Sequence, residues 1–569
     1  MEYIVFFAVI LVLYIIIVIQ GKMNEKKIEK HFRERLRKEY GSFMNTSYSE
    51  ERMKAMTGMY EWHQGEAFTV DDITWDDIDG DRLYKSINHC YSSAGDEYLY
   101  YRMRTPSLTE NKEEFDKNEK IYAYLQENEA ERLRFQILFA KLGRTGKFSL
   151  YRYMQYLCEL PKKSLILFVI PWVLMVLSVA LFFVNIHAGI FSLVAILLYQ
   201  NFTYMKRKSE IEPYLISFNY ILRLLMTAEA VGAKTPEIWK EEGEELLSLR
   251  KKLRGISGIN IMFVSTDYSS NAATDIVSAI LMFVKMMTHL DLFLFYRMLG
   301  LVSAHTAEID RINRIIGKME TDITVSAFRN ILPEYAIPDW VGEGMEIEEA
   351  AHPLIENAVA NSFSIQKGML LTGSNASGKS TFLKTVAICA LLAQTLQTVP
   401  AKSYRAQRYR IYSSMSLRDD LESGESYYMV EIRSIKRILE AADEDGVKVL
   451  CFVDEVLRGT NTVERIAAAS EIMRSFSSEN MLSFAATHDI ELTQLLSDVY
   501  DNYHFEEEIA NNDILFPYKL LKGPANTRNA IKLLRLMGYP QEMIKRAEWM
   551  AGNFLENGDW KTANDIKVR

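Results

Sequence analysis

A short glycine-rich stretch constrains the fold of this chain more than any other feature. Residues 373–380 read GSNASGKS, directly after the apolar run 368–371 and before a helix-like pattern over 381–396. The spacing GxxxxGK[ST] between a strand and a helix is typical of a loop that cradles phosphates, because its glycines turn backbone N–H groups toward the ligand. The first turn of the helix adds positive potential. The expected phosphate contacts are Gly373, Ser374, Asn375, Ala376, Ser377, Gly378, Lys379, Ser380 and Thr381.

Two residues of this loop have distinct expected roles. Lys379 is expected to reach the β- and γ-phosphates of a nucleoside triphosphate and to assist catalysis. The hydroxyl group of Ser380 is expected to bind Mg²⁺. The sequence therefore predicts ATP and Mg²⁺ as ligands.

Polar side chains follow two further apolar runs. The strand-like run 447–453 ends in Asp454 and Glu455. We expect Asp454 to hold Mg²⁺ and Glu455 to orient or deprotonate the attacking water, with an ordinary turn as the alternative. The run 482–486 ends near His488, at the edge where open α/β sheets bind ligands. His488 is expected to sense the γ-phosphate or to stabilise the transition state, with a structural histidine as the alternative.

These motifs, in this order, resemble the MutS family of ATPases. The glycine-rich loop is similar to that family's TGPNMAGKST. Residues 454–460 resemble its DELGRGT, except that Leu457 stands where the usual motif has its first Gly. The further matches are Leu392-Ala393-Gln394 and Val399-Pro400-Ala401 to LAQ…VPA, residues 419–431 to DDLASGRSTFMVE, Thr487-His488 to ATH, and His352-Pro353 and Asn361 to the HP and PN positions. The resemblance covers about residues 350–490.

The resemblance implies a site that two copies of the chain share. MutS and ABC ATPases sandwich ATP between two such domains, so a homodimer through the ATPase domain is expected. Ser426 would then contact, in trans, the ATP of the partner, and Gln394 would belong to the nucleotide contacts. A helix N-cap is the alternative for Ser426. The resemblance also implies DNA, mismatched or branched, as a possible partner. The family's mismatch-recognition domain is expected to be missing, because an apolar segment stands at the N-terminal end.

Three apolar segments indicate a membrane protein. They are residues 3–19, 164–184 and 186–204, and a spanning helix needs roughly 20 apolar residues. We expect about three transmembrane helices in a lipid bilayer. The alternatives are a signal peptide for the first segment and a buried helical hairpin for the other two. A fourth stretch, 276–302, carries several charges and is expected to be a buried helix of a soluble core.

Positive charges flank these segments unevenly. They follow the first segment, precede the second and follow the third, whereas the connection around residues 185–189 has no lysine or arginine. The positive-inside rule then predicts a multi-pass protein of the plasma membrane, with its N-terminus outside and its ATPase domain in the cytoplasm. Contact with nucleic acid is the alternative for the basic run after the first segment. The flanking residues are Lys22, Lys26, Lys27, Lys30, Arg33, Arg35, Arg37, Lys38, Lys162, Lys163, Lys206, Arg207 and Lys208.

Length, charge and cysteine content narrow the fold further. A chain of 569 residues is expected to form about two to four domains. The net charge of -9 excludes a surface that is basic all over, and the cysteines form no CxxC pair, so no zinc site or disulfide framework is indicated. The expected fold is an α/β P-loop NTPase domain of the ABC/MutS type, with a mainly parallel sheet, joined to an all-α MutS-like core. The expected division is 1–21 for a transmembrane helix, 22–160 for a cytoplasmic first part of the core, 161–208 for a transmembrane hairpin, 209–330 for the second part of the core, 331–522 for the P-loop ATPase domain and 523–569 for a helical dimerisation segment.

The function that these features favour is a membrane-anchored MutS-like ATPase that couples ATP hydrolysis to conformational switching, on DNA by family resemblance. One alternative is an ATP-driven switch at the membrane, or an ABC-type transport ATPase, with no DNA role. An ABC half-transporter would carry about six spans in one block, unlike the split segments here. Another alternative is a scaffold that binds ATP as a structural ligand, against which the intact Asp454, Glu455 and His488 argue.

Overall fold

The computed structural model divides the chain into two compact units. The helical unit contains Met1–Ala67, Arg82–Thr105 and Asn111–Pro333, and the sheet unit contains Phe68–Asp81, Pro106–Glu110 and Glu334–Arg569. The structure describes residues 20, 23–24, 26–45, 47–146, 148–161, 164–257, 283–374, 377–415, 427–444, 446–457, 461–510, 513–525, 530–558 and 560. The first expected membrane segment, 3–19, and the predicted contacts Asn375, Ala376 and Ser426 lie outside the described residues.

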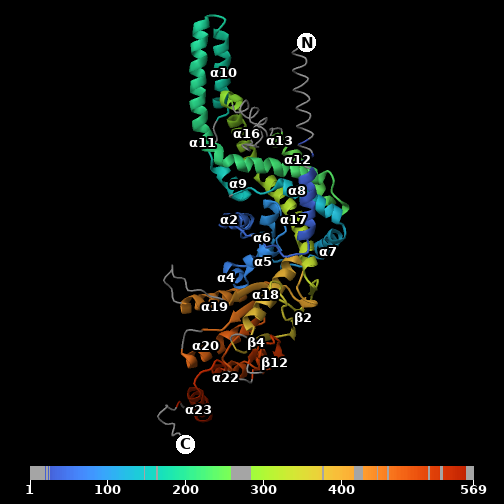
Figure 1. Cartoon of the computed structure of the whole chain (residues 1–569), viewed down its shortest axis with the longest axis vertical. Coiled ribbons are helices and arrows are strands. Elements are labelled where there is room, and N and C mark those ends of the chain that lie inside the picture. The colour runs from blue at the N-terminus through green and yellow to red at the C-terminus, as the bar shows by residue number, and fades with distance from the viewer. Residues whose placement is uncertain are drawn as a thin grey trace. The chain divides into compact units, whose positions relative to one another are not determined.

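The described part of the helical unit contains helices and no strand (Figure 1). The all-α core that the apolar spacing predicted is confirmed in this respect. Its helices are α2 (Glu50–Met56), α3 (Gly58–Trp62), α5 (Gly80–Ile87, which begins in the sheet unit), α6 (Ser93–Arg104), α7 (Lys112–Glu127), α8 (Glu129–Leu142), α9 (Leu150–Glu159), α10 (Ile166–Leu181), α11 (Ile186–Gly232), η1 (Glu237–Trp239), α12 (Lys240–Lys252), α13 (Arg254–Ser257), α16 (Leu290–Ala304) and α17 (Thr306–Ile331).

Helices α6 and α17 pack along each other at the centre of this unit. Helix α6 begins where Oγ of Ser92 accepts the Gly95 N–H at 3.1 Å, which satisfies a donor that the helix leaves unpaired. Gly317 of α17 lies so close to α6 that a Cβ there would meet the carbonyl oxygen of Ala94 at 2.4 Å. The close approach of the two backbones therefore requires glycine at this position.

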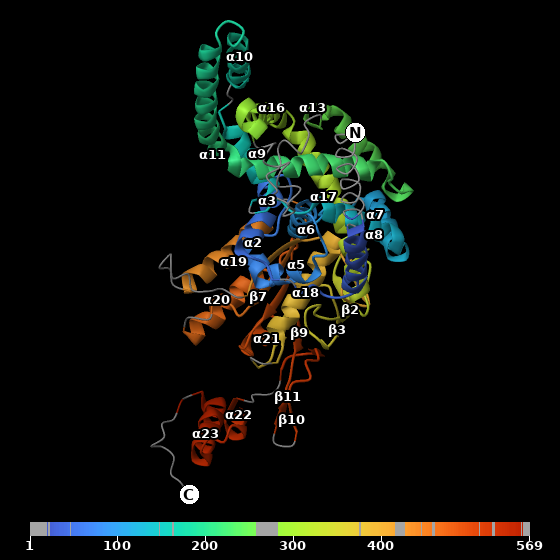
Figure 2. The same cartoon turned by 45° about the horizontal axis from the view of Figure 1, so that its top comes forward.

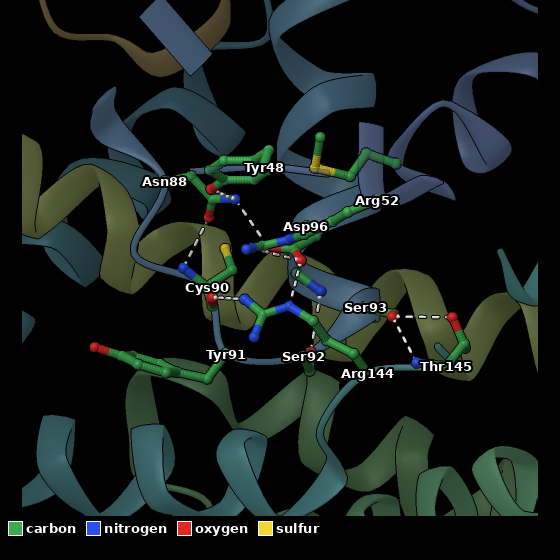
Figure 3. Close-up of polar contacts among 12 residues, drawn as sticks. Tyr48, Arg52, Asn88, Cys90, Tyr91, Ser92, Ser93, Asp96, Arg144 and Thr145 are labelled. Atoms are coloured by element: carbon green, nitrogen blue, oxygen red, sulfur yellow. Dashed lines mark hydrogen bonds and ion pairs between the residues drawn. The ribbon is translucent and has the colours of Figure 1, made fainter. Parts of the chain in front are cut away.

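A network of buried polar groups joins α6 to its surroundings (Figure 3). The Asp96 carboxylate is 2% exposed and accepts hydrogen bonds from Nδ2 of Asn88 and Nε of Arg144, both at 2.8 Å, and from Arg52 at 3.2 Å. Donors that carry charge form the stronger hydrogen bonds, which offsets the cost of burying the carboxylate. The network connects α2 and the loop that carries Arg144 to the start of α6.

A second buried carboxyl group, that of Glu320 on α17, faces the segment before α6. It is 1% exposed and accepts the backbone N–H groups of Tyr91 and Ser92. Burial raises the pKa of Glu320 to about 7, although the hydrogen bonds from the Ser92 hydroxyl and the Tyr91 N–H lower it. The protonation state of this group therefore changes near neutral pH.

Helices α10 and α11 form a hairpin (Figures 1 and 2). The two helices are joined by a hydrogen bond in which Nε2 of Gln200 on α11 donates to the carbonyl oxygen of Pro171 on α10 at 3.0 Å. Both helices expose large apolar side chains, such as Val176 of α10 at 67% and Phe191 of α11 at 78%, and Phe183 in the connection between them is 89% exposed. The hairpin that the sequence predicted from the second and third apolar segments is thus present, and it is not buried.

The two helices of the hairpin differ in whether they are long enough to span a membrane. Among the described residues, one helical stretch, Ile186–Ile211, is long and apolar enough to cross a membrane. Helix α10 has 16 residues, which is below the roughly 17 that the shortest spans need. The described part of the chain therefore supports one of the three expected spans by length and composition. Of the stretch 276–302 that was expected to be a buried helix, residues 290–302 lie in α16, where Leu292, Phe295 and Met298 are buried. Phe283 is 56% exposed, and residues 276–282 lie outside the described residues.

Helix α11 corrects one expected boundary. It continues for 47 residues, from Ile186 to Gly232, through the expected domain limit at residue 208. Its second half buries Phe218, Tyr220 and Leu224 in the helical unit. The hydroxyl oxygen of Tyr220 accepts the Ala94 N–H at 3.1 Å. The apolar hairpin and the second part of the core are therefore built on one helix.

The sheet unit is an α/β domain. Its main sheet has the strand order β12-β9-β4-β8-β7-β6, in which the five strands from β9 to β6 are parallel and β12 is antiparallel. The mainly parallel sheet that strand–helix alternation predicted is confirmed. The strands are β1 (Asp339–Trp340), β2 (Met345–Ala350), β3 (Asn361–Ile365), β4 (Gly368–Thr372), β5 (Ser403–Ala406), β6 (Arg410–Ser414), β7 (Val449–Asp454), β8 (Met481–Ala486), β9 (Tyr500–His504), β10 (Glu508–Ala510), β11 (Asp513–Leu515) and β12 (Leu521–Lys522).

The sheet unit also contains helices and two smaller sheets (Figures 1 and 2). A four-stranded sheet has the order β1-β5-β2-β3, and β10 pairs with β11. The helices are α4 (Asp72–Asp77), α18 (Lys379–Leu396), α19 (Tyr427–Asp443), α20 (Thr462–Ser475), α21 (Glu491–Leu495), α22 (Ala530–Leu536) and α23 (Gln541–Asn557). Helices α4, α18 and α19 contact strands of the main sheet, whereas α22 and α23 pack on each other.

Helix α4 belongs to the sheet unit although it lies far upstream in sequence. The hydroxyl oxygen of Thr74 accepts the Ser413 N–H of β6 at 3.0 Å, and Lys384 of α18 lies 3.2 Å from Asp79. The expectation that residues 22–160 form one part of the helical core is therefore wrong for residues 68–81 and 106–110, which pack with the sheet. These short segments carry no sequence signal that distinguishes them from the helices around them.

Candidate nucleotide site

The glycine-rich loop connects β4 to α18, as predicted. Gly373 has a φ of +143°, and a Cβ there would lie 2.5 Å from the carbonyl oxygen of Phe505, so only glycine fits. Gly378 is the N-cap of α18 and also has a left-handed φ, +103°. Lys379 begins the helix, and its ammonium group donates to the carbonyl oxygens of Gly373 and Ser374 at 2.8 Å. The lysine thus lies over the loop where phosphates would bind.

The serines of the loop have different partners. Oγ of Ser377 donates to the carbonyl oxygen of Ser374 at 2.8 Å, which fixes the turn. Oγ of Ser374 donates to Oε2 of Glu507 at 3.0 Å. Sequence reasoning missed Glu507, which is 133 residues away and stands in no motif. Ser380 and Thr381 are exposed in the first turn of α18.

The two expected Mg²⁺ ligands are in contact. Oγ of Ser380 donates to Oδ2 of Asp454, the last residue of β7. Among the described residues, no group of three or more His, Cys, Asp or Glu side chains could hold a metal ion. Mg²⁺ takes few protein oxygens and completes its shell with water and phosphate oxygens. A hydroxyl and a carboxylate beside a phosphate loop therefore fit Mg²⁺.

The predicted catalytic groups meet next to this pair. Nε2 of His488 lies 2.7 Å from Oε1 of Glu455 and 3.4 Å from Nζ of Lys379. Glu455 has a left-handed φ of +60°, and its N–H donates to the carbonyl oxygen of Ala486 at 2.8 Å, at the end of the neighbouring strand β8. The structure thus brings together Lys379, Glu455 and His488 at the carboxyl ends of parallel strands, where α/β sheets bind ligands.

A cavity of about 610 Å³ opens beside the first turn of α18. Two residues that the resemblance marked, His352 and Asn361, line it. Asn361 also holds the wall of the cavity together, because its Nδ2 donates to the Tyr518 carbonyl at 3.0 Å and its Oδ1 accepts the Leu520 N–H at 2.8 Å. The lining residues include Ala350, Ile355, Glu356, Asn357, Val359, Phe382 and Thr385. The volume suits a small heterocyclic ligand.

The structure does not bring Gln394 to this site. Gln394 stands 15 residues after Lys379 on the same helix, roughly 22 Å along its axis at 1.5 Å per residue. Its side chain is 4% exposed, donates to the Tyr409 carbonyl at 3.1 Å and accepts the Tyr409 N–H at 2.6 Å. It therefore fixes α18 against the segment before β6.

The sequence of the unit that carries this site is similar to that of known proteins. Residues 369–554 match the family model of MutS domain V. The DNA mismatch repair protein MutS of Clostridium kluyveri is 33% identical over 266 residues, which are 43% of this chain and 30% of that protein. The protein of the same description from Desulfovibrio desulfuricans is 35% identical over 241 residues, 39% of this chain and 26% of that protein. The one from Thermus thermophilus is 32% identical over 211 residues, 36% and 26%.

The matched part spans less than a third of the length of these relatives. It contains the glycine-rich loop and the strand-end groups described above. Residues 369–554 of this chain thus form a domain of the MutS domain V family.

Proposed function

We propose that this protein binds and hydrolyses ATP in a Mg²⁺-dependent reaction. The observation that supports this most is the convergence of Lys379, the Ser380–Asp454 pair and the Glu455–His488 pair at one edge of the sheet. Each group answers one requirement of phosphoryl transfer, namely charge neutralisation, metal binding and activation of water.

The roles of the residues follow from their positions. The cavity beside α18 accommodates the nucleotide base, and Lys379 turns from the loop carbonyls to the phosphates. Mg²⁺ supplies positive charge that stabilises the charge developing on the phosphate oxygens. Glu455 accepts a proton from the attacking water, and His488 holds the Glu455 carboxylate through its 2.7 Å contact. Ser380 and Asp454 are the residues that would hold the metal ion.

A homodimer through the sheet unit completes this proposal. Ser426 of each chain would contact the γ-phosphate bound by the other, in keeping with the family resemblance. Helices α22 and α23 are the proposed dimerisation segment. The apolar side chains of Met537 and Met543 are 76% and 53% exposed there, which supports a partner on this surface.

The ligand that the ATPase controls is proposed to be DNA, mismatched or branched, because the relatives are described as DNA mismatch repair proteins. A membrane-associated switch with no DNA role is the second candidate, and the exposed apolar hairpin favours it. We propose that this hairpin enters the plasma membrane and that the sheet unit is cytoplasmic. Lys206, Arg207 and Lys208 follow the apolar part of α11 and suit anionic headgroups.

Two variants test the ATPase. Lys379→Ala should abolish ATP binding, because it removes the cation that faces the phosphates. Glu455→Ala should keep ATP binding and stop turnover. Equilibrium binding of labelled ATP and phosphate release by the purified full chain measure both effects. Hydrolysis at the wild-type rate in the Glu455 variant would contradict the assigned base.

The DNA proposal has its own test. Binding of mismatched, branched and perfect duplexes is compared over a series of salt concentrations, because phosphate contacts weaken steeply with salt. A preference for mismatched or branched DNA supports the proposal. Equal background binding of all duplexes at low salt would leave the membrane-associated switch as the function.

A further inference from the structure

The turn after β7 has an unusual backbone. Glu455 and Leu457 both have left-handed conformations, with φ of +60° and +61°. Side chains disfavour this region, and a leucine there is an outlier that surrounding contacts must hold in place. Leu457 stands where the usual family motif has glycine, so this chain needs a restraint that a glycine would not.

Two hydrogen bonds hold this turn from opposite sides. The Glu455 N–H donates to the carbonyl oxygen of Ala486 in β8 at 2.8 Å. The Leu457 N–H donates to Oε1 of Glu431 on α19. Glu431 is 2% exposed, and its carboxylate is a stronger acceptor than a neutral group. The sheet therefore fixes one end of the turn, and α19 fixes the other.

Packing joins the turn to α19 as well. Val456 and Leu457 are 6% and 4% exposed, and they belong to the same buried apolar cluster as Ile435 and Ile438 of α19. A shift of α19 would therefore act on the turn through both the hydrogen bond and the apolar contacts. Because Glu455 is two residues from Leu457, its carboxylate would move with the turn.

We propose that Glu431 is a positioning residue that sets the Glu455 carboxylate in its catalytic place through the Leu457 N–H. Helix α19 begins at Tyr427, directly after Ser426 in the sequence. The proposed function places Ser426 in contact with the partner's nucleotide. On that basis, Glu431 also connects the partner's nucleotide to Glu455, the general base of its own chain. The two sites of a dimer are then coupled through one helix.

The main test separates turnover from ATP binding. Glu431→Ala removes the acceptor and should lower kcat between about tenfold and a hundredfold, as a misplacement on the order of 1 Å does. The Kd for a non-hydrolysable ATP analogue should stay within about twofold, because no ATP contact is lost. Glu431→Gln keeps an acceptor oxygen and should recover most of the rate.

A matched control stands on the same helix. Glu440 is 66% exposed and lies 3.4 Å from Lys436, so Glu440→Gln makes the same chemical change without touching the turn. It should leave kcat unchanged. The proposal is overturned by Glu431→Ala turnover within about twofold of the wild type, or by parallel loss of ATP affinity and kcat. If Glu431→Ala does not fold, Glu431→Gln serves as the test. The proposal is then overturned if Glu431→Gln binds ATP more weakly and turns over as slowly as Glu455→Ala.

A double-mutant cycle tests the coupling between sites. Ser426→Ala, Glu431→Ala and the double variant are compared by kcat. If Glu431 carries the coupling, the double variant loses less than the product of the two single losses. A fully multiplicative loss overturns the coupling. A wild-type chain without ATPase activity would instead refute the proposed function, so the two failures are distinguishable.

Discussion

The Asp77 carboxylate accepts a hydrogen bond from Oγ of Ser413 at 2.6 Å, and both side chains are buried although 336 residues separate them. The same Oδ2 atom accepts the Met415 N–H at 2.8 Å. The contact ties α4 to the end of β6, shortly before residues 419–431, which resemble the family's DDLASGRSTFMVE. The sheet unit therefore uses an upstream segment to fix this edge.

Removing this carboxylate should loosen the edge of the sheet. Asp77→Ala deprives the Ser413 hydroxyl and the Met415 N–H of their acceptor, at a cost of about 1–3 kcal/mol. The amides of β6 should then exchange with solvent about five- to 150-fold faster, as measured by hydrogen exchange and mass spectrometry. Asp79→Ala is the control. Asp79 pairs with Lys384, but its side chain is 54% exposed, so this ion pair should contribute less than about 1 kcal/mol to the free energy of unfolding. Equal protection in both variants would contradict the structural role of Asp77.

Glu320 should give the helical unit a stability that depends on pH. Its pKa is raised from 4.5 to about 7 in the folded chain, so the folded state keeps a proton that the unfolded chain loses. This stabilisation is fully present below about pH 4.5 and is lost as the pH rises through about 7. Glu320→Gln cannot titrate, so its Tm should fall less than that of the wild type between these limits.

Circular dichroism of the full chain over a pH series measures this difference. Burial also raises the pKa of Glu97, which gives a slope of the same sign, but Glu97 is present in both proteins and cancels in the comparison. Parallel Tm curves for the wild type and Glu320→Gln would show that Glu320 has no raised pKa.

The hairpin between α10 and α11 should reach the outer face of the membrane. The test uses a chain in which the exposed Cys158 is replaced by serine, so that it cannot be labelled. In this chain, His187, which is exposed at the tip of the hairpin, is replaced by cysteine. An impermeant maleimide should label this chain in intact cells. A cysteine at the exposed position Glu471 of α20 should react only after lysis. Labelling of both positions, or of neither, in intact cells would refute this topology.

Local patterns explain what the sequence predicted well. The loop between β4 and α18, the strand-end residues Asp454, Glu455 and His488, and the parallel sheet all follow from runs of neighbouring residues. The physical reason is that a buried strand needs a continuous apolar run, and a phosphate loop needs glycines at fixed spacing.

Contacts between distant segments explain what could not be predicted. Glu507 reaches Ser374 across 133 residues, and Asp77 reaches Ser413 across 336, with no pattern near either end. Gln394 shows the opposite case, since its motif was found but its side chain bonds to the Tyr409 backbone and not to the site. A motif reports that a residue belongs to a fold, and it does not distinguish a ligand contact from a packing contact.

The 47 residues of α11 are helical throughout, although Pro213 stands between its apolar part and the half that packs in the helical unit. A proline in a helix interior removes a backbone hydrogen bond and kinks the helix, and Figure 1 shows that α11 changes direction between the hairpin and its second half. A spanning helix adjusts its tilt to bilayer thickness, so thin and thick bilayers should change the angle at Pro213 and shift the second half of α11 against α8 and α12, which pack on it. Hydrogen exchange around Tyr220 in vesicles of short- and long-chain lipids measures this shift, and identical exchange in both would show that the helix does not transmit it.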